Sequence, residues 1–317
     1  MKEFVDRITR PSRKWSDQFV IAAVLSVVLT LAGEILSEIV FKAAHAREFL
    51  VRILGSDNLA AFFTTYLSFF GIWLAALLLI AIPRSNRPML KAWGCNREGN
   101  TIKAAAIGAL LGFGTNGFCV LMSVLMGDIK LSYFGFNPAI LLGFLFVVFI
   151  QSAAEEITDR LYLYQKLRRR YKSPLIAILV NPLVFMLMHV FNDGFTILAG
   201  VQIVLAGIIF SLIVYYYNSL WAAMCFHTLW NYTQNIIFGL PNSGAVSEYS
   251  IFKLEAASAT SGFFYDVGFG VEGSIGSTLV LAVVLAAILF INRGNGEKRD
   301  YWADIAIDVG NERERQE

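Results

Sequence analysis

The sequence predicts an all-α, polytopic membrane protein, a bundle of about eight transmembrane helices with a polar site inside the membrane. Apolar residues make up 56% of the 317 residues and charged residues 16%, against about 45–50% and about 25% in soluble domains. The mean hydropathy is +0.59. More than half of a soluble protein's surface is already apolar, so a soluble chain of this length has no room to bury the excess. Soluble, disordered and fibrous proteins are therefore excluded.

The transmembrane helices are expected where apolar runs reach about 20 residues, enough to cross roughly 30 Å of hydrocarbon. Residues 1–292 then form a single transmembrane domain and residues 293–317 a charged cytoplasmic tail. In the third run, Gly108 and Gly112 give a small-xxx-small face, which is typical of close helix packing. The eight runs are 18–41, 59–82, 102–126, 138–165, 174–191, 195–217, 219–240 and 273–292.

Basic residues indicate which side of the membrane each connection faces. Four segments carry five Lys or Arg residues each: the amino-terminal segment, the second–third connection, the fourth–fifth connection and the tail. These account for 20 of the 26 basic residues, and only five lie in the opposite connections. Cytoplasmic connections carry such an excess. We therefore expect an integral protein of the cytoplasmic membrane with both termini in the cytoplasm. Its surroundings are the lipid bilayer, and no nucleic acid is expected as a partner.

The fourth run ends in a charged hexad, residues 155–160, that contains Glu155, Glu156, Asp159 and Arg160. An ionisable group at mid-bilayer costs at least about 2.5–3.5 kcal/mol on insertion scales, which makes each one a functional hypothesis. Glu156 and Arg160 are four residues apart on a helix and can pair. Glu155 lies about 100° away without that partner, so it can accept a proton near neutral pH. The alternative is a solvated helix end, which explains Asp159 and Arg160 better than it explains two adjacent glutamates.

Two histidines and an asparagine lie in later runs. His189 is in the fifth run, and His227 and Asn231 share a helix face in the seventh. Each has a structural alternative: a satisfied buried histidine for His189, and interhelical hydrogen bonding for the other two. At about 1.5 Å per residue, these side chains and Glu155 fall within a slab about 10 Å thick. The common depth predicts a single polar site.

These residue types fit the hydrolysis of an amide bond. Glu155, alone or with His189, is suited to hold and deprotonate a water molecule, and His227 and Asn231 are suited to donate hydrogen bonds to the developing oxyanion. No serine or cysteine stands beside a base at motif spacing, which argues against a covalent nucleophile. No cofactor is expected; a divalent metal at the Glu and His side chains is the less favoured alternative, because the histidines lie on separate helices. Replacing Glu155 by Ala is expected to abolish cleavage, whereas replacing Glu34 is not.

Three motifs in this region resemble those of the CPBP family, which comprises type II CAAX prenyl endopeptidases and bacteriocin-processing or immunity proteins, also called Abi proteins. They are Glu-Glu-x-x-x-Arg at 155–160, Phe-x-x-x-His at 185–189 and His-x-x-x-Asn at 227–231. The resemblance covers a core of about residues 138–240 and implies an eight-helix intramembrane endopeptidase, a glutamate-dependent hydrolase whose relatives were earlier labelled metalloproteases. By this resemblance, Glu155 and His189 hold the attacking water, and His227 and Asn231 form the oxyanion site. Glu156 and Arg160 support these residues.

Two residues depart from the family pattern. Many bacterial members have an aromatic residue before the motif arginine and a glycine after it, whereas this chain has Asp159 and Leu161. An added acid beside Arg160 can compete for the guanidinium, which puts activity in question more than fold.

The expected function is that of an intramembrane endopeptidase that cleaves a membrane-associated protein or peptide. One alternative is a proton-coupled transporter, which also needs buried ionisable residues but predicts inverted repeats that the sequence does not display. The other is a non-catalytic immunity protein of the same family.

Overall fold

The computed structural model describes residues 2–11 and 13–303, with side chains from Val5 onward apart from residue 12. Residues 304–317, the greater part of the expected charged tail, lie outside the described residues. The helices are α1 (Lys2–Ile8), α2 (Phe19–Ala43), α3 (Ala46–Leu54), α4 (Asp57–Ser68), α5 (Phe70–Ala81), α6 (Met89–Trp93), α7 (Ile102–Leu125), α8 (Pro138–Glu156), α9 (Tyr164–Arg170), α10 (Pro174–His189), α11 (Ile197–Tyr217), α12 (Leu220–Tyr232) and α13 (Ile275–Ile291).

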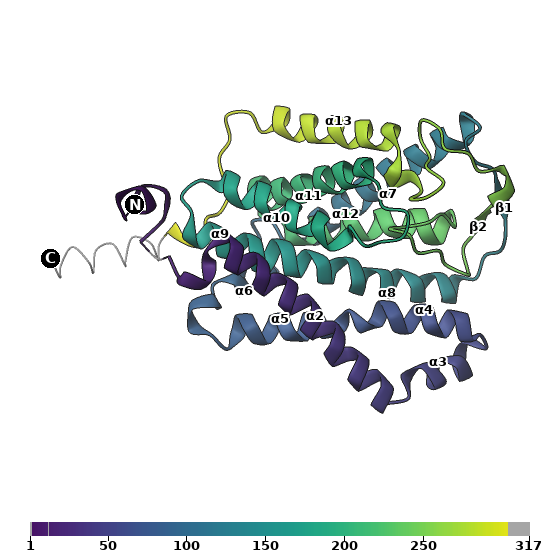
Figure 1. Ribbon diagram of the computed structural model, residues 1–317, viewed down its shortest axis with the longest axis horizontal. Helices are drawn as coiled ribbons and strands as arrows, with labels where there is room; N and C mark the ends of the chain where they lie inside the picture. The colour runs from purple at the N-terminus through teal and green to yellow at the C-terminus, as the bar shows by residue number, and fades with distance from the viewer. Residues whose placement is uncertain (1, 12, 304–317) are drawn as a thin grey trace.

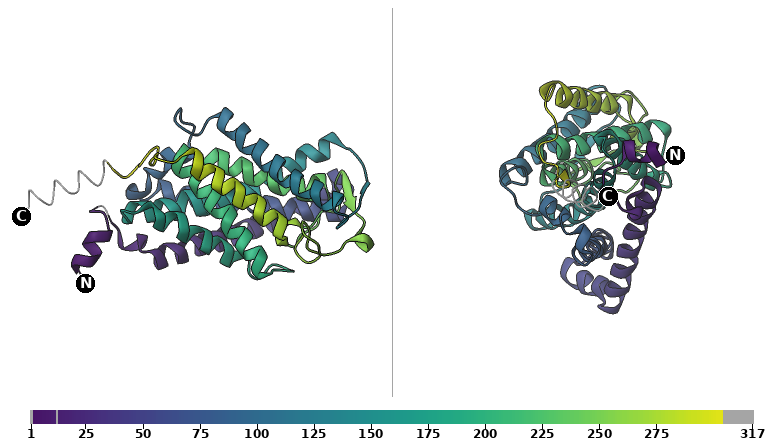
Figure 2. Two further views of the ribbon diagram at one scale, coloured as in Figure 1. Left: turned by 90° about the horizontal axis from the view of Figure 1, so that it is seen from above. Right: turned by 90° about the vertical axis from the view of Figure 1, so that its left-hand side faces the viewer.

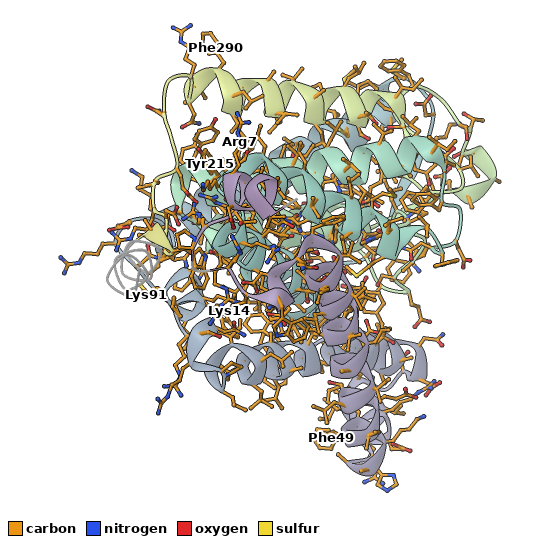
Figure 3. All side chains as sticks on the ribbon, turned by 60° about the vertical axis from the view of Figure 1, so that its left-hand side comes forward. Arg7, Lys14, Phe49, Lys91, Tyr215 and Phe290 are labelled. Atoms are coloured by element: carbon orange, nitrogen blue, oxygen red, sulfur yellow. The ribbon has the colours of Figure 1, made fainter. Side chains whose placement is uncertain are left out.

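The long helices lie side by side along the long axis of the molecule (Figures 1 and 2). The amino-terminal segment lies at one end, and strands β1 (Leu131–Tyr133) and β2 (Phe252–Leu254) form an antiparallel pair at the other. α2 crosses the bundle obliquely, and α3, which carries Phe49, lies at the edge farthest from α13 (Figures 1 and 3). The amino-terminal and strand-bearing ends are thus well separated, as expected for a bundle that spans a bilayer.

The predicted all-α membrane class is confirmed, and each of the eight predicted runs is helical. Within the described residues, five helices are long and apolar enough to cross a membrane, and α10 and α13 are shorter apolar helices. The seventh run is α12, extended by a π-helical segment, Thr233–Ile237. The second run is divided into α4 and α5 at Phe69.

The fourth helix is longer than the predicted 138–165. α8, a π-helical segment (Ile157–Leu163) and α9 form one continuous helix, Pro138–Arg170, of 33 residues. Its last turns carry basic residues that the sequence assigned to the fourth–fifth connection. That assignment is wrong, because these residues are helical and their side chains are buried.

Carboxylates from both ends of the chain explain why the basic turns are buried. Lys166 lies 3.0 Å and Arg169 2.5 Å from the carboxylate of Asp17, in the segment before α2. Arg168 pairs with Glu297, in the segment after α13. These three buried cations therefore have anionic partners, as burial requires, and Arg170 donates to the backbone carbonyl oxygen of Lys14 at 2.9 Å. The beginning of the expected tail is part of the folded bundle.

α12 packs closely on α7 through the two glycines that the sequence singled out. A Cβ atom on Gly108 would lie 2.1 Å from the carbonyl oxygen of Ala222, and one on Gly112 would lie 2.1 Å from that of Phe226. The small-xxx-small face is therefore a packing surface, as predicted. It sets the position of α12, the helix that carries His227.

We expect Gly112→Ala to destabilise the protein by about 1–3 kcal/mol, because the added methyl overpacks the α7–α12 contact. Thermal unfolding in detergent measures the effect. Gly114→Ala is the matched control on the same helix, since nothing lies within 4 Å of its Cβ position. Equal unfolding temperatures for the two variants would contradict the close packing.

Candidate active site

Polar side chains from α8, α10 and α12 meet at one cavity inside the bundle. The cavity has a volume of about 820 Å³, and its wall includes Glu155, His189, His227 and Asn231, with α2 along one side. The sequence placed these four residues at a common depth on three helices. The structure brings them to one cavity.

Glu155 lies near the end of α8 and keeps 15% of its side chain exposed. Its Oε1 accepts a hydrogen bond of 2.6 Å from Gln151, one helical turn earlier. Its Oε2 lies 3.5 Å from Nε2 of His227. As predicted, Glu155 is not paired with Arg160. The imidazole of His227 faces its carboxylate instead. The carboxylate is held in place but still borders the cavity.

Glu156, Asp159 and Arg160 form a cluster behind the cavity wall, and each of their side chains is 0% exposed. Arg160 donates to Oε1 of Glu156 at 3.0 Å, whereas Asp159 lies farther from the same nitrogen, at 3.8 Å. The rings of Phe185 and Phe210 lie 4.9 and 5.2 Å from the guanidinium carbon. The alternative interpretation of residues 155–160 as a solvated helix end is therefore wrong. Asp159 does not displace Glu156 from the arginine.

His227 lies between the two glutamates. Its Nδ1 is 3.0 Å from Oε1 of Glu156. A carboxylate that also accepts from Arg160 has no proton to give, so Nδ1 of His227 carries the hydrogen and donates it. The ring stacks on Phe210, with centroids 5.4 Å apart. These contacts direct Nε2 toward Glu155.

Asn231, one turn after His227, has both ends of its amide engaged. Its Nδ2 donates to Oγ of Ser152 at 3.1 Å and to Oε1 of Gln151 at 3.4 Å. Its Oδ1 accepts from Nδ2 of Asn242 at 3.1 Å. The amide N–H groups therefore point at α8, about one helical turn before Glu155.

His189 is the last residue of α10. Its Nδ1 lies 2.8 Å from the carbonyl oxygen of Phe185, the first residue of the Phe-x-x-x-His motif. A carbonyl only accepts, so Nδ1 is the donor and Nε2 of the neutral ring keeps a free lone pair. The Phe185 ring also contacts His189, with centroids 4.5 Å apart. The motif thus sets both the tautomer and the position of this imidazole.

Two further residues of the cavity wall, Asn242 and Glu272, were missed by the sequence reasoning. Both are buried in the connection between α12 and α13. Burial raises the pKa of the Glu272 carboxyl, against hydrogen bonds from the Ser243 amide and the Trp230 indole. The depth of a residue in the membrane can be estimated from the sequence only within an apolar run, and Asn242 and Glu272 lie outside the runs. The signal available was an acid in a glycine-rich stretch immediately before the last run.

Glu34 of α2 also lines the cavity. The sequence reasoning treated it as unrelated to Glu155. A variant at this position is therefore not a suitable control for the site.

The donor set does not fit a metal ion. Among the described residues, no group of three or more His, Cys, Asp or Glu side chains is arranged to hold one. His227 faces a glutamate with each ring nitrogen, and Nδ1 of His189 is bound to a backbone carbonyl.

A bundle of apolar helices around carboxylate, imidazole and amide groups defines an integral, polytopic membrane protein with a polar site among its spans. Residues 137–233 match the family model described as Rce1-like, type II CAAX prenyl endopeptidase. The match contains all three motifs and confirms the resemblance to the CPBP family, a family of CAAX-type intramembrane endopeptidases. A comparison with curated proteins finds no match.

Proposed function

We propose that this chain is an intramembrane endopeptidase that hydrolyses a peptide bond of a membrane-associated protein or peptide. The observation that carries the proposal is the shared cavity of Glu155, His189, His227 and Asn231. A base, a second proton acceptor and two hydrogen-bond donors are the groups that water-mediated amide hydrolysis requires.

In this proposal Glu155 and His189 hold the attacking water. Glu155 offers a carboxylate oxygen at the cavity, and His189 offers the lone pair of Nε2, because its Nδ1 is bound to Phe185. Glu155 takes one proton as the water oxygen bonds to the scissile carbonyl carbon. It then returns that proton to the leaving nitrogen as the C–N bond breaks, so that protons balance over the cycle.

His227 and Asn231 stabilise the oxyanion of the tetrahedral intermediate. Asn231 directs its amide N–H groups at Ser152 and, at 3.4 Å, at Gln151, and in this proposal the oxyanion takes the place of the more distant acceptor, Gln151. Nδ1 of His227 is bound to Glu156, so Nε2 is the ring nitrogen left to donate to the oxyanion when it carries a proton. Donors fixed before the reaction cost no reorganisation in the transition state.

We also propose an orientation and an extent for the membrane domain. Residues 1–292 form one transmembrane unit whose amino terminus and following tail lie in the cytoplasm, in accord with the distribution of basic residues. The membrane in question is the cytoplasmic membrane.

The oxyanion role predicts that Asn231→Ala lowers kcat about 10²–10³-fold with little change in KM, since the lost hydrogen bond forms mainly in the transition state. The probe is a farnesylated peptide ending in Cys-aliphatic-aliphatic-X, the substrate class that the family description names. Asn58→Ala, at an exposed site on α4, is the control. An Asn231→Ala enzyme with wild-type kcat would remove this residue from the mechanism.

A further inference from the structure

Glu272 lies in the connection just before α13 and collects three hydrogen bonds. Its Oε1 accepts from the indole of Trp230 at 3.1 Å and from Nδ2 of Asn242 at 3.2 Å. Its Oε2 accepts from the backbone amide of Ser243 at 3.0 Å. A buried carboxylate with three donors is a fixed anchor, and Trp230 ties it to α12 directly beside Asn231.

Asn242 connects this anchor to Asn231. Its Nδ2 donates both to Glu272 and to Oδ1 of Asn231. An ionised carboxylate only accepts, so Glu272 requires the amide nitrogen of Asn242 on its side. Because Nδ2 of Asn242 only donates, it must face Oδ1 of Asn231 and not the amide nitrogen of that residue. The amide of Asn231 is left with its N–H groups directed at α8.

The turn that carries Asn242 is held in place at several points. Asn242 and Ala245 exchange two backbone hydrogen bonds of 2.9 Å each. Gly244 has a φ of +89° and lies so close to the Asp193 backbone that a Cβ there would come within 2.9 Å. Asn235 donates to the Ala245 carbonyl oxygen at 2.9 Å. The position of Asn242 is therefore set by backbone contacts, and its amide orientation by Glu272.

We propose that Glu272 and Asn242 are positioning residues that fix the amide of Asn231 with its donors toward the oxyanion. The proposal rests on the oxyanion role of Asn231. Both residues lie beyond the segment 137–233 that matches the family model, so this chain supplies them from its last connection. Other ionisable groups on the same cavity wall are Glu34, Tyr66, Glu155, His189 and His227, and none of these is hydrogen bonded to Asn242 in the described structure.

The sharpest test is Asn242→Asp, which keeps the size of the side chain and replaces a donor by an acceptor. The new carboxyl faces Glu272, and it attracts Nδ2 of Asn231 in place of Oδ1, which turns the Asn231 donors away from α8. We expect kcat on the farnesylated probe to fall about 10²-fold or more, close to the loss in Asn231→Ala, with KM nearly unchanged.

A double-mutant cycle separates positioning from a general structural role. If Asn242 acts through Asn231, adding Asn242→Asp to Asn231→Ala changes kcat by less than about threefold, because coupled residues are not additive. Multiplicative losses would overturn the proposal, and so would wild-type kcat in Asn242→Asp. Wild-type kcat in Asn231→Ala would instead contradict the proposed oxyanion site itself.

Hydrogen exchange of the purified full chain provides a readout that does not depend on activity. Glu272→Gln weakens the carboxylate's bond to the Ser243 amide, so we expect faster exchange at residues 242–245 at an unchanged unfolding temperature. Wild-type protection of this turn would overturn the anchoring role of Glu272.

Discussion

Glu155→Gln is expected to lower the rate of peptide cleavage by about 10²–10⁴-fold, the usual contribution of a general base. The amide preserves the size of the side chain and can still be held near Gln151, but it accepts no proton from water. The measurement is single-turnover cleavage of the farnesylated probe by purified protein. The loss is expected in the chemical step, with binding of the probe retained.

Glu38→Gln is the matched control for this experiment. Glu38 is an exposed acid on α2 that pairs with Lys42 at 2.6 Å, one turn beyond Glu34, and it is not part of the cavity wall. Its replacement is expected to leave the cleavage rate unchanged. Cleavage by Glu155→Gln at the rate of Glu38→Gln would exclude the glutamate as the base.

Arg160→Met is expected to cause the largest loss of stability, about 3–5 kcal/mol, since it removes one partner of a buried ion pair. Glu156 and Asp159 would then remain in the core without the guanidinium, each 0% exposed. Thermal unfolding of the purified protein measures the loss. Expression in the membrane is expected to fall with it.

Two further variants serve as controls for this prediction. Arg52→Met, at an exposed position on α3, should have little effect on the unfolding temperature. Combining Arg160→Met with Glu156→Gln and Asp159→Asn should recover part of the loss, because no buried charge is then left unpaired. An Arg160→Met protein as stable as wild type would mean that the cluster is hydrated.

The sequence predicts the fold class and the meeting of the polar clusters because both follow from hydropathy and depth. Apolar runs specify spans, and a polar residue in a span faces the bundle interior, where it meets polar residues of other spans. The contact between the α8 carboxylates and His227 on α12 is the clearest success of this reasoning. It needs only the positions of residues along helices.

Long-range partners are what the sequence does not predict. The basic turns of α9 were predicted to be a connection between spans because their partners, Asp17 and Glu297, are more than a hundred residues away in the chain. Asn242 and Glu272 lie in an irregular connection, where no periodicity shows which way a side chain points. The π-helical segments after Glu156 and Asn231 likewise depend on tertiary packing, and such segments often occur at functional sites.

Comparative membrane proteomics of cells that carry wild type, Glu155→Gln or Glu38→Gln tests the central claim most directly, since it requires no prior choice of substrate. The account predicts that uncut precursors of at least one membrane-associated protein accumulate with Glu155→Gln, and that the matching cleaved ends appear with wild type and Glu38→Gln. Identical cleaved ends in all three strains, at equal levels of the protein, would contradict it.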